Sequence, residues 1–332
     1  MKLSPGRYSF PLLLFVTVGL AVVFPEPVHE GGSLSSNWLT RLSVALVFFL
    51  QGMSLPTQSL AAGYRPLRLH GLVLFWNFIG FPVVTLLLLY PLAGVLPGEL
   101  LIGFGMLALL PTTIASATAF TAMSAGNTAN SIVSSVLSNL LAVFVVPAVS
   151  VVYFSLEFSV DIPFGKVLFG LICMLLIPLL LGQIAQKIFK LNIGSVAKFA
   201  RRTSAGIILF IVYLAFAKSM NAEMFVSLSV GWLVITVFLV VFLILVTSLL
   251  VWISTKWVKL AAPQRSAAFY CASQKSLAAG LPLISSVLLA MPEMEDTAVI
   301  LIPLLCFHPL QMLLAGMISS KLMQQPVAQS DF

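Results

Sequence analysis

Long apolar segments follow one another along almost the whole chain, separated by short breaks rich in proline, glycine and charged residues. An α-helix of about 20 apolar residues spans the hydrocarbon core of a bilayer. The pattern therefore predicts an all-α polytopic membrane protein whose first segment is an uncleaved helix, since no small-residue cleavage site follows it. The ten transmembrane helices are expected at residues 8–24, 38–55, 67–90, 99–123, 128–153, 165–189, 202–218, 225–254, 265–290 and 297–320.

Composition supports the membrane class and removes several kinds of function. Hydrophobic residues make up 60% of the 332 residues and charged residues only 8%, whereas soluble domains average about 25% charged residues. Cys173, Cys271 and Cys306 all lie in apolar segments and form no spaced pairs. That argues against a disulfide framework or a thiolate metal cluster, and no cofactor is expected.

The charged residues indicate orientation rather than nucleic-acid binding. The net charge is +7, and most of the 17 lysine and arginine residues fall in alternate breaks. Cytoplasmic segments of membrane proteins are enriched in such residues. We therefore expect a multi-pass protein of the bacterial inner (cytoplasmic) membrane, embedded in the lipid bilayer, with both termini in the cytoplasm and no nucleic-acid partner.

All ten acidic residues map to outer breaks, helix ends or the C-terminal tail, so no carboxylate is expected in the membrane interior. Intramembrane proteases need paired carboxylates, and acyltransferases or phosphatases need clusters of His, Asp and Glu. The sequence therefore predicts that the protein is not an enzyme. A passive channel and an auxiliary regulator stay open as alternatives to a carrier.

Short internal similarities suggest two repeats of opposite orientation. The related segments lie five helices apart, which inverts one half relative to the other, as in many secondary transporters. The expected parts are a first five-helix repeat over 1–153, a second inverted repeat over 154–323 and a disordered tail over 324–332. The matching elements are Arg41-Leu42-Ser43 with Arg202-Thr203-Ser204, and Ala115-Ser116 with Ala272-Ser273.

The fourth and ninth segments carry the most unusual residues. Both contain runs of small and hydroxyl side chains followed by glycine, which suits interrupted helices whose freed backbone groups need partners. Interrupted helices in corresponding places of two repeats mark a transport site, although ordinary small-residue packing would produce a similar pattern. The expected substrate and coupling crossover consists of Ser116, Ala117, Thr118, Ser273, Gln274, Lys275 and Ser276.

Lys275 is the strongest single indicator of function. It lies deep within the ninth segment, where a charge costs several kcal/mol and is functional by default. Because no intramembrane carboxylate is available, its partner is expected to be polar backbone, water, a hydroxyl or a bound anion. The alternative is a lysine in a wet crevice without a role in transport.

The chain resembles the bile acid:sodium symporter family, also called solute carrier family 10, and is most similar to its member 7-like bacterial subgroup. The resemblance covers nearly the whole chain and is most specific around Lys275 and His308. The matching stretches are Phe48-Phe49-Leu50-Gln51-Gly52-Met53-Ser54-Leu55, Leu69-His70, Phe81-Pro82, Leu110-Pro111 to Ser116, Gly126-Asn127 to Pro147, Tyr270-Cys271-Ala272-Ser273-Gln274-Lys275-Ser276-Leu277, Pro303-Leu304-Leu305 and His308-Pro309-Leu310-Gln311.

The resemblance implies a panel domain and a core domain, each drawn from both repeats, with helices 4 and 9 broken and crossed in the core. It also implies secondary active transport of a small organic anion by alternating access. In sodium-coupled members, sodium is held near the crossover. The equivalent positions here are Asn77, Ser116, Ala117, Ser131, Ser135, Tyr270, Cys271, Ser273 and Gln274.

Three departures from the family pattern put sodium coupling in doubt. Tyr270 stands where the family has the glutamate that serves both sodium sites, and Ala117 stands where it has an asparagine. Lys275 stands where the family has an asparagine directly after the glutamine that corresponds to Gln274. Our hypothesis is that the Lys275 ammonium replaces a coupling cation or carries a coupling proton. The alternatives are a symporter that retains a modified Na⁺ site and a membrane regulator that does not transport.

His308 is a possible proton relay, since imidazole titrates near neutral pH. A histidine bonded to a neighbouring backbone carbonyl is the alternative.

Overall fold

A computed structural model describes residues 9–28, 32–35, 37–55, 63–157, 164–189, 193–221, 229–290 and 297–323. Within these ranges every regular element is helical. The predicted disordered tail, 324–332, lies outside them. The elements are α1 Ser9–Val23, η2 Glu26–Val28, α2 Asn37–Ser54, α4 Leu67–Phe75, η4 Trp76–Gly80, α5 Phe81–Leu89, η5 Tyr90–Leu92, α6 Gly98–Leu109, α7 Ile114–Met123, α8 Thr128–Glu157, α9 Phe164–Ile188, α10 Ile193–Asn221, α11 Val230–Trp257, α12 Ala262–Ser273, α13 Leu277–Ala290 and α14 Thr297–Met323.

The predicted helix positions coincide with these elements except at their ends. The largest difference concerns the predicted helix 202–218, which as α10 begins at Ile193. The extra turns carry Lys198 and Arg201, and both side chains are exposed. Because lysine and arginine are good helix formers, the helix continues beyond its apolar part. The apolar pattern marks only the membrane-facing portion.

Several of the helices are long and apolar enough to cross a membrane. In the described part of the chain six helices meet this condition, and a seventh span results if α6 and α7, bent by 59° at a short break, count together. Large apolar side chains such as Phe169, Phe238 and Leu87 are 69%, 67% and 70% exposed. Such exposure is expected where lipid, not water, surrounds the helices. The chain is therefore a multi-pass membrane protein.

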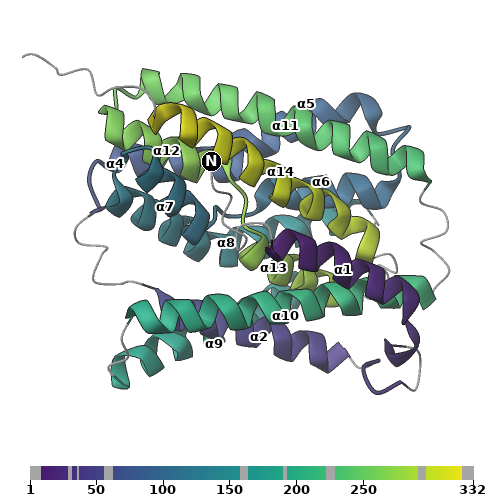
Figure 1. The fold of residues 1–332 in the computed structure, drawn as a ribbon. Helices are drawn as coiled ribbons and strands as arrows, with labels where there is room; N and C mark the ends of the chain where they lie inside the picture. The colour runs from purple at the N-terminus through teal and green to yellow at the C-terminus, as the bar shows by residue number, and fades with distance from the viewer. Residues whose placement is uncertain are drawn as a thin grey trace, which may run out of the picture.

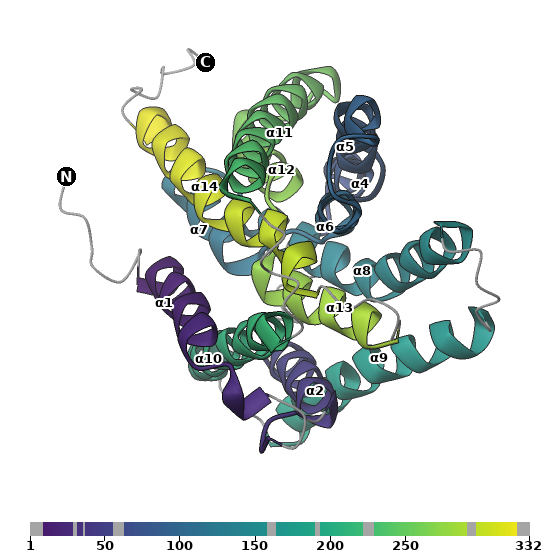
Figure 2. The same ribbon diagram turned by 90° about the vertical axis from the view of Figure 1, so that its right-hand side faces the viewer.

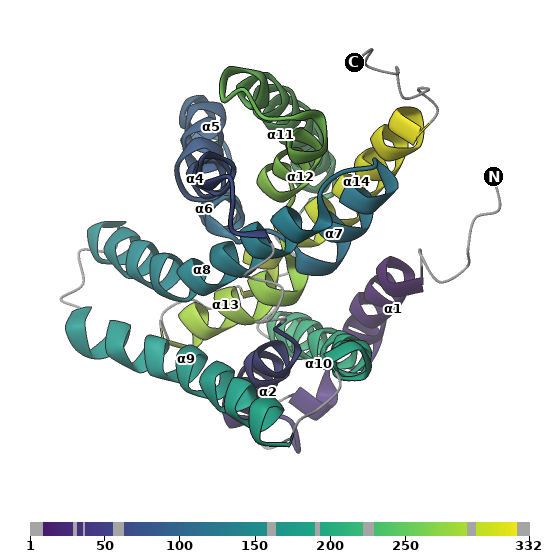
Figure 3. The ribbon, with the colours of Figure 1, turned by 90° about the vertical axis from the view of Figure 1, so that its left-hand side faces the viewer.

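The helices form two layers (Figure 1). The lower layer in that view contains α1, α2, α9 and α10, and the upper body contains α4 to α8, α11, α12 and α14. Views from either side show α13 between the layers (Figures 2 and 3). It contacts α2, α9 and α10 on one side and α8 and α14 on the other. The segment that precedes α13 is therefore positioned at the centre of the molecule.

Gly52 on α2 and Gly182 on α9 let these two helices approach closely within the lower layer. A Cβ added at Gly52 would overlap the carbonyl oxygen of Leu179. A Cβ added at Gly182 would overlap the carbonyl oxygen of Phe49 and lie 2.8 Å from the nitrogen of Met53. We expect Gly182→Ala to lower the free energy of unfolding by about 1–3 kcal/mol, because the helices must separate. Gly170→Ala on the same helix is the control, since its added Cβ meets no atom within 4 Å. Thermal unfolding in detergent measures both, and equal midpoints would contradict the prediction.

Candidate functional site

The first broken helix is interrupted between α6 and α7. Pro111 disfavours helical geometry at the preceding Leu110, which is extended with φ −66° and ψ 149°. The Thr113 hydroxyl then caps α7, accepting from the backbone nitrogens of Ser116 at 3.2 Å and Ala117 at 3.4 Å. The sequence Leu-Pro-Thr-Thr thus ends one helix and starts the next at an angle of 59°.

The second broken helix is interrupted between α12 and α13. Gln274 is extended, with φ −101° and ψ 145°, and ends α12. The hydroxyl of Ser276 caps α13 by accepting from the nitrogen of Ala279 at 3.1 Å. Between them Lys275 lies outside either helix, with its side chain fully buried.

The two breaks contact each other. The backbone nitrogen of Ser276 donates to the carbonyl oxygen of Pro111 at 2.8 Å. The hydroxyl of Ser116 donates to Oε1 of Gln274 at 3.0 Å. Backbone groups freed by one break are therefore satisfied partly by the other, which is how non-helical backbone is tolerated inside a membrane protein.

The Lys275 ammonium group fills a cage of backbone carbonyls beside this contact. Its Nζ lies 3.0 Å from the oxygen of Asn77, 2.7 Å from that of Ala108 and 2.8 Å from that of Leu110. It also lies 4.3 Å from the ring centroid of Phe81. We call the three carbonyl oxygens with the Phe81 ring the carbonyl cage.

The sequence explains why these three carbonyls lack hydrogen-bond partners within their own helices. Ala108 and Leu110 lie at the C-terminal end of α6, where carbonyls lack helical partners and carry the negative end of the helix dipole. Asn77 lies in the π-helix η4, in which the nitrogen of Phe81 donates to the carbonyl of Trp76. The next residue, Pro82, has no N–H to offer. The carbonyl of Asn77 is thereby left for Lys275.

The cage suits a charged lysine. An ammonium group has three hydrogens and no acceptor, which matches three carbonyl oxygens. Three hydrogen bonds to a charged group contribute about 1.5–3 kcal/mol each, and a desolvated cation–π contact adds about 2 kcal/mol. Together these offset a burial cost of several kcal/mol. The acidic residues of the described ranges, Glu26, Glu99 and Glu157, lie at the starts or ends of helices. None of them belongs to the carbonyl cage.

A second group of predicted residues gathers around Cys271 on α12. The Cys271 sulfur lies 3.2 Å from the hydroxyl of Ser131 and 3.6 Å from that of Ser135, both on α8. Ser131 also lies 3.4 Å from the hydroxyl of Thr118. The Asn77 amide donates to the Cys271 carbonyl at 3.4 Å. The structure therefore brings these five residues together, one helical turn from Lys275.

Other predicted residues lie elsewhere or turn away. The Tyr270 hydroxyl lies 2.8 Å from that of Ser124, beyond the far end of α7, and its ring stacks on Phe120. The Ser273 hydroxyl donates back to the carbonyl of Phe269 in its own helix at 2.7 Å. The Tyr270 and Ser273 hydroxyls thus bond partners other than the residues gathered around Cys271.

Gln311 on α14 was not among the predicted site residues, yet it holds the peptide of Lys275. Its Oε1 accepts from the Lys275 nitrogen at 2.7 Å, and its Nε2 donates to the Lys275 oxygen at 2.6 Å. Nε2 also lies 3.1 Å from Nδ1 of His308. A buried glutamine in an apolar helix, one turn after that histidine, is the signal that could have identified it.

Ser138 and Asn139 on α8 were missed as well. The Ser138 hydroxyl accepts from the Asn77 amide at 3.0 Å and from the Thr112 nitrogen at 3.2 Å. The Asn139 amide donates to the carbonyl of Thr112 at 2.9 Å. The adjacent polar pair continues the polar positions Ser131 and Ser135 along α8 and marks the place where α8 supports the α6–α7 break.

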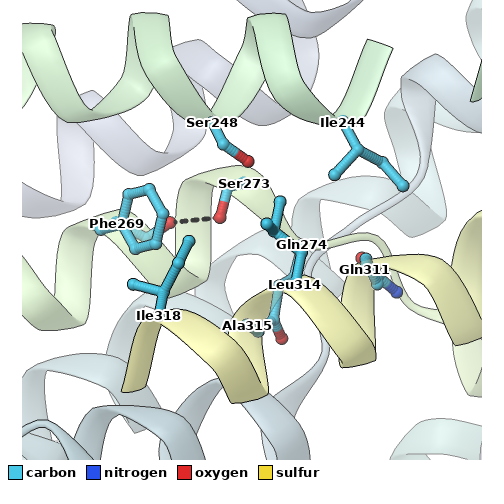
Figure 4. A pocket seen from close by; sticks show the side chains of 9 residues that line it. All are labelled: Ile244, Ser248, Phe269, Ser273, Gln274, Gln311, Leu314, Ala315 and Ile318. Carbon is cyan, nitrogen blue, oxygen red and sulfur yellow. Dashed lines mark hydrogen bonds between the residues drawn. The ribbon is translucent and has the colours of Figure 1, made fainter. Parts of the chain in front are cut away.

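A small cleft lies beside Ser273, Gln274 and Gln311 (Figure 4). The space within it that the centre of a water-sized sphere can occupy measures about 10 Å³, which is room for about one water molecule. Ser248, Ser273, Gln274 and Gln311 supply its polar atoms, and apolar side chains surround them. Nε2 of Gln274 is buried without a hydrogen-bond partner among the described residues. The wall of the cleft is therefore about as polar as it is apolar.

Comparisons with known proteins match nearly the whole of this chain to a single transporter family. The model of the SBF-like CPA transporter family matches residues 8–324. Sodium/bile acid cotransporter 7 of Danio rerio is 28% identical over 315 residues, covering 93% of this chain and 91% of its own. The Escherichia coli protein YfeH, provisionally named as a symporter, is 29% identical over 336 residues, covering 98% and 96%. An uncharacterized protein of Pseudomonas aeruginosa is 28% identical over 321 residues, covering 94% and 92%. The predicted resemblance is confirmed, and the chain belongs to the SBF-like CPA transporter family.

Proposed function

We propose that this protein is a secondary active transporter that moves a small organic anion across the inner membrane by alternating access, with the Lys275 ammonium in place of a coupling cation. The observation that carries the proposal is the position of Lys275 Nζ among three backbone carbonyls at the contact of two broken helices. The organic-anion class rests on relatives named as bile acid cotransporters.

The proposed architecture has ten spans in two inverted repeats of five. The described helices that do not qualify as spans by length and composition are α1, α2 and the pair α12 and α13. We count each helix, and the pair together, as a span, because they pack within the same two layers as the qualifying helices. The lower layer then corresponds to the panel and the upper body to the core, with both termini cytoplasmic.

An ammonium group can substitute for sodium in such a site. Both carry one positive charge and both take oxygen ligands from the protein, and backbone carbonyls are ligands of this kind. Unlike sodium, the ammonium of Lys275 is tethered and cannot leave with the substrate. A tethered cation would hold the broken helices together in every state of the transport cycle without a sodium gradient. Should Lys275 release a proton during the cycle, coupling to protons would replace coupling to sodium.

Alternating access requires the two layers to move relative to each other. We assign α13 to the upper body because it continues from α12, and in the described part of the chain hydrogen bonds join α13 and α14 to the lower layer. Nε2 of Gln51 on α2 donates to the carbonyl of Ala278 on α13 at 3.1 Å, and the Ala298 nitrogen on α14 donates to the Ser219 hydroxyl on α10 at 3.3 Å. Both are single bonds at helix surfaces, so they can break as the layers rock.

Transport in proteoliposomes tests the proposal. Purified protein is reconstituted, and counterflow of radiolabelled acetate, pyruvate, succinate and taurocholate is measured with sodium or choline as the cation on both sides. We expect saturable counterflow of at least one of these anions, at the same rate in choline as in sodium. A carrier that requires sodium would contradict the coupling proposal. Absence of saturable counterflow for every anion would contradict the transport proposal.

A symporter with a modified sodium site is the second candidate, and one observation favours it. Oδ1 of Asn77 and the Thr112 hydroxyl are buried without partners among the described residues, and both residues bond Ser138. Such oxygens are suitable ligands for a small hard cation. Under this alternative, counterflow in the same experiment would increase when choline is replaced by sodium.

A further inference from the structure

Gln311 makes a paired contact with the backbone of a single residue. Its side-chain oxygen and nitrogen bond the backbone nitrogen and oxygen of Lys275 at 2.7 Å and 2.6 Å, as one strand of a β-sheet would bond its neighbour. Gln311 is only 3% exposed. Lys275 lies in the break between α12 and α13, so helical hydrogen bonds do not hold its peptide in place. Gln311 supplies the missing bonds.

The orientation of this amide follows from its partners. The Lys275 N–H requires an acceptor and the Lys275 carbonyl requires a donor, so a flipped amide would lose both bonds. The second hydrogen of Nε2 faces Nδ1 of His308 at 3.1 Å. Nδ1 must therefore act as an acceptor, which places the ring proton of a neutral His308 on Nε2. His308 thus supports Gln311, and its ring also interacts with the Lys275 backbone.

We propose that Gln311 is a positioning residue that fixes the peptide of Lys275 and thereby directs its side chain into the carbonyl cage. Without these two bonds, rotation of the non-helical Lys275 backbone would withdraw Nζ from the oxygens of Asn77, Ala108 and Leu110. The inference rests on the proposed function for the role of Lys275, but the position of its side chain is measurable without a transport substrate.

Chemical modification of lysine measures whether the Lys275 side chain stays within the carbonyl cage. Detergent-purified protein is treated with formaldehyde and borane, which methylate accessible amines, and modification at Lys275 is followed by peptide mass spectrometry. Lys275 should be protected in the natural protein, whereas the exposed Lys256 should react. In Gln311→Met, which keeps the side-chain length, the loss of two hydrogen bonds should raise the modification rate of Lys275 about thirtyfold.

Cys271 provides an internal control for loosening of the whole region. Its sulfur is fully buried one turn before Lys275, and N-ethylmaleimide reports its exposure in the same samples. The matched variant is Gln183→Met, which removes another glutamine that donates to a backbone carbonyl, that of Gly52 in the lower layer. We expect Lys275 to stay protected in Gln183→Met and Cys271 to stay protected in both variants.

Two results would overturn the role of Gln311. One is a Gln311→Met protein in which Lys275 reacts as slowly as in the natural protein. The other is equal acceleration at Lys275 and Cys271, which would indicate general loosening rather than local release. Sodium-dependent counterflow would overturn the proposed coupling while leaving the labelling result intact, so the two proposals fail separately.

Discussion

Replacing Lys275 with methionine will lower the free energy of unfolding by about 3–5 kcal/mol, the range seen when one partner of a buried charged contact is removed. Methionine fills similar space but leaves the carbonyls of Asn77, Ala108 and Leu110 without their donor. Each unsatisfied buried acceptor costs about 1–3 kcal/mol. Denaturant unfolding in detergent or mixed micelles, followed by tryptophan fluorescence, measures the change.

Lys256→Met is the matched control because Lys256 is exposed near the end of α11. Its effect should stay within about 0.5 kcal/mol, as for most surface substitutions. A Lys275→Met protein as stable as this control would show that the cage does not depend on the ammonium group.

Linking the two layers covalently will stop transport. Cysteines introduced by Gln51→Cys and Ala278→Cys replace a pair that is hydrogen-bonded between α2 and α13. Bridging them with a short bifunctional thiol reagent should reduce counterflow to below about a tenth, since rigid-body movement of one layer past the other is blocked. The native Cys173, Cys271 and Cys306 are first replaced by alanine, and uptake of a transported anion is compared before and after bridging.

A bridge within one layer is the control. The Tyr213 hydroxyl of α10 donates to the carbonyl of Phe24, just after α1, at 2.7 Å. Phe24→Cys with Tyr213→Cys should accept the same reagent and keep most of its uptake. Equal inhibition by both bridges, or undiminished uptake in the first, would contradict movement between these layers.

The sequence was sufficient to predict the helical segments and both interruptions, because these depend on local properties. Apolar length sets the helices, and Pro111 with the following threonines requires a break before α7. The absence of carboxylates from the apolar segments also restricted the partners of Lys275 to a short set that included polar backbone. The observed partners are carbonyls of that kind.

Residue roles that depend on contacts distant in sequence were not predictable. The resemblance gave Asn77 only as the equivalent of a sodium-site position, and it did not indicate that the main-chain oxygen of Asn77 reaches Lys275 because η4 and Pro82 free it. Gln311 lies 36 residues from Lys275, and no local pattern links them. The resemblance likewise did not indicate that the Tyr270 hydroxyl bonds Ser124, 146 residues away in the sequence.

Cation-dependent stability of Lys275→Ala tests the central claim most directly. The unfolding midpoints of this variant and the natural protein are measured in sodium, methylammonium and choline chloride at equal ionic strength. Removing the lysine leaves the carbonyl cage open, so sodium or methylammonium should raise the midpoint of the variant above its value in choline. Binding to the folded state alone stabilises by roughly 2.7 kcal/mol at about a hundredfold excess over Kd. The natural protein, whose cage holds its own cation, should show no such difference. Two results would contradict the proposal that Lys275 substitutes for a coupling cation. One is a sodium-specific rise in the unfolding midpoint of the natural protein, and the other is a variant whose midpoint rises with neither sodium nor methylammonium.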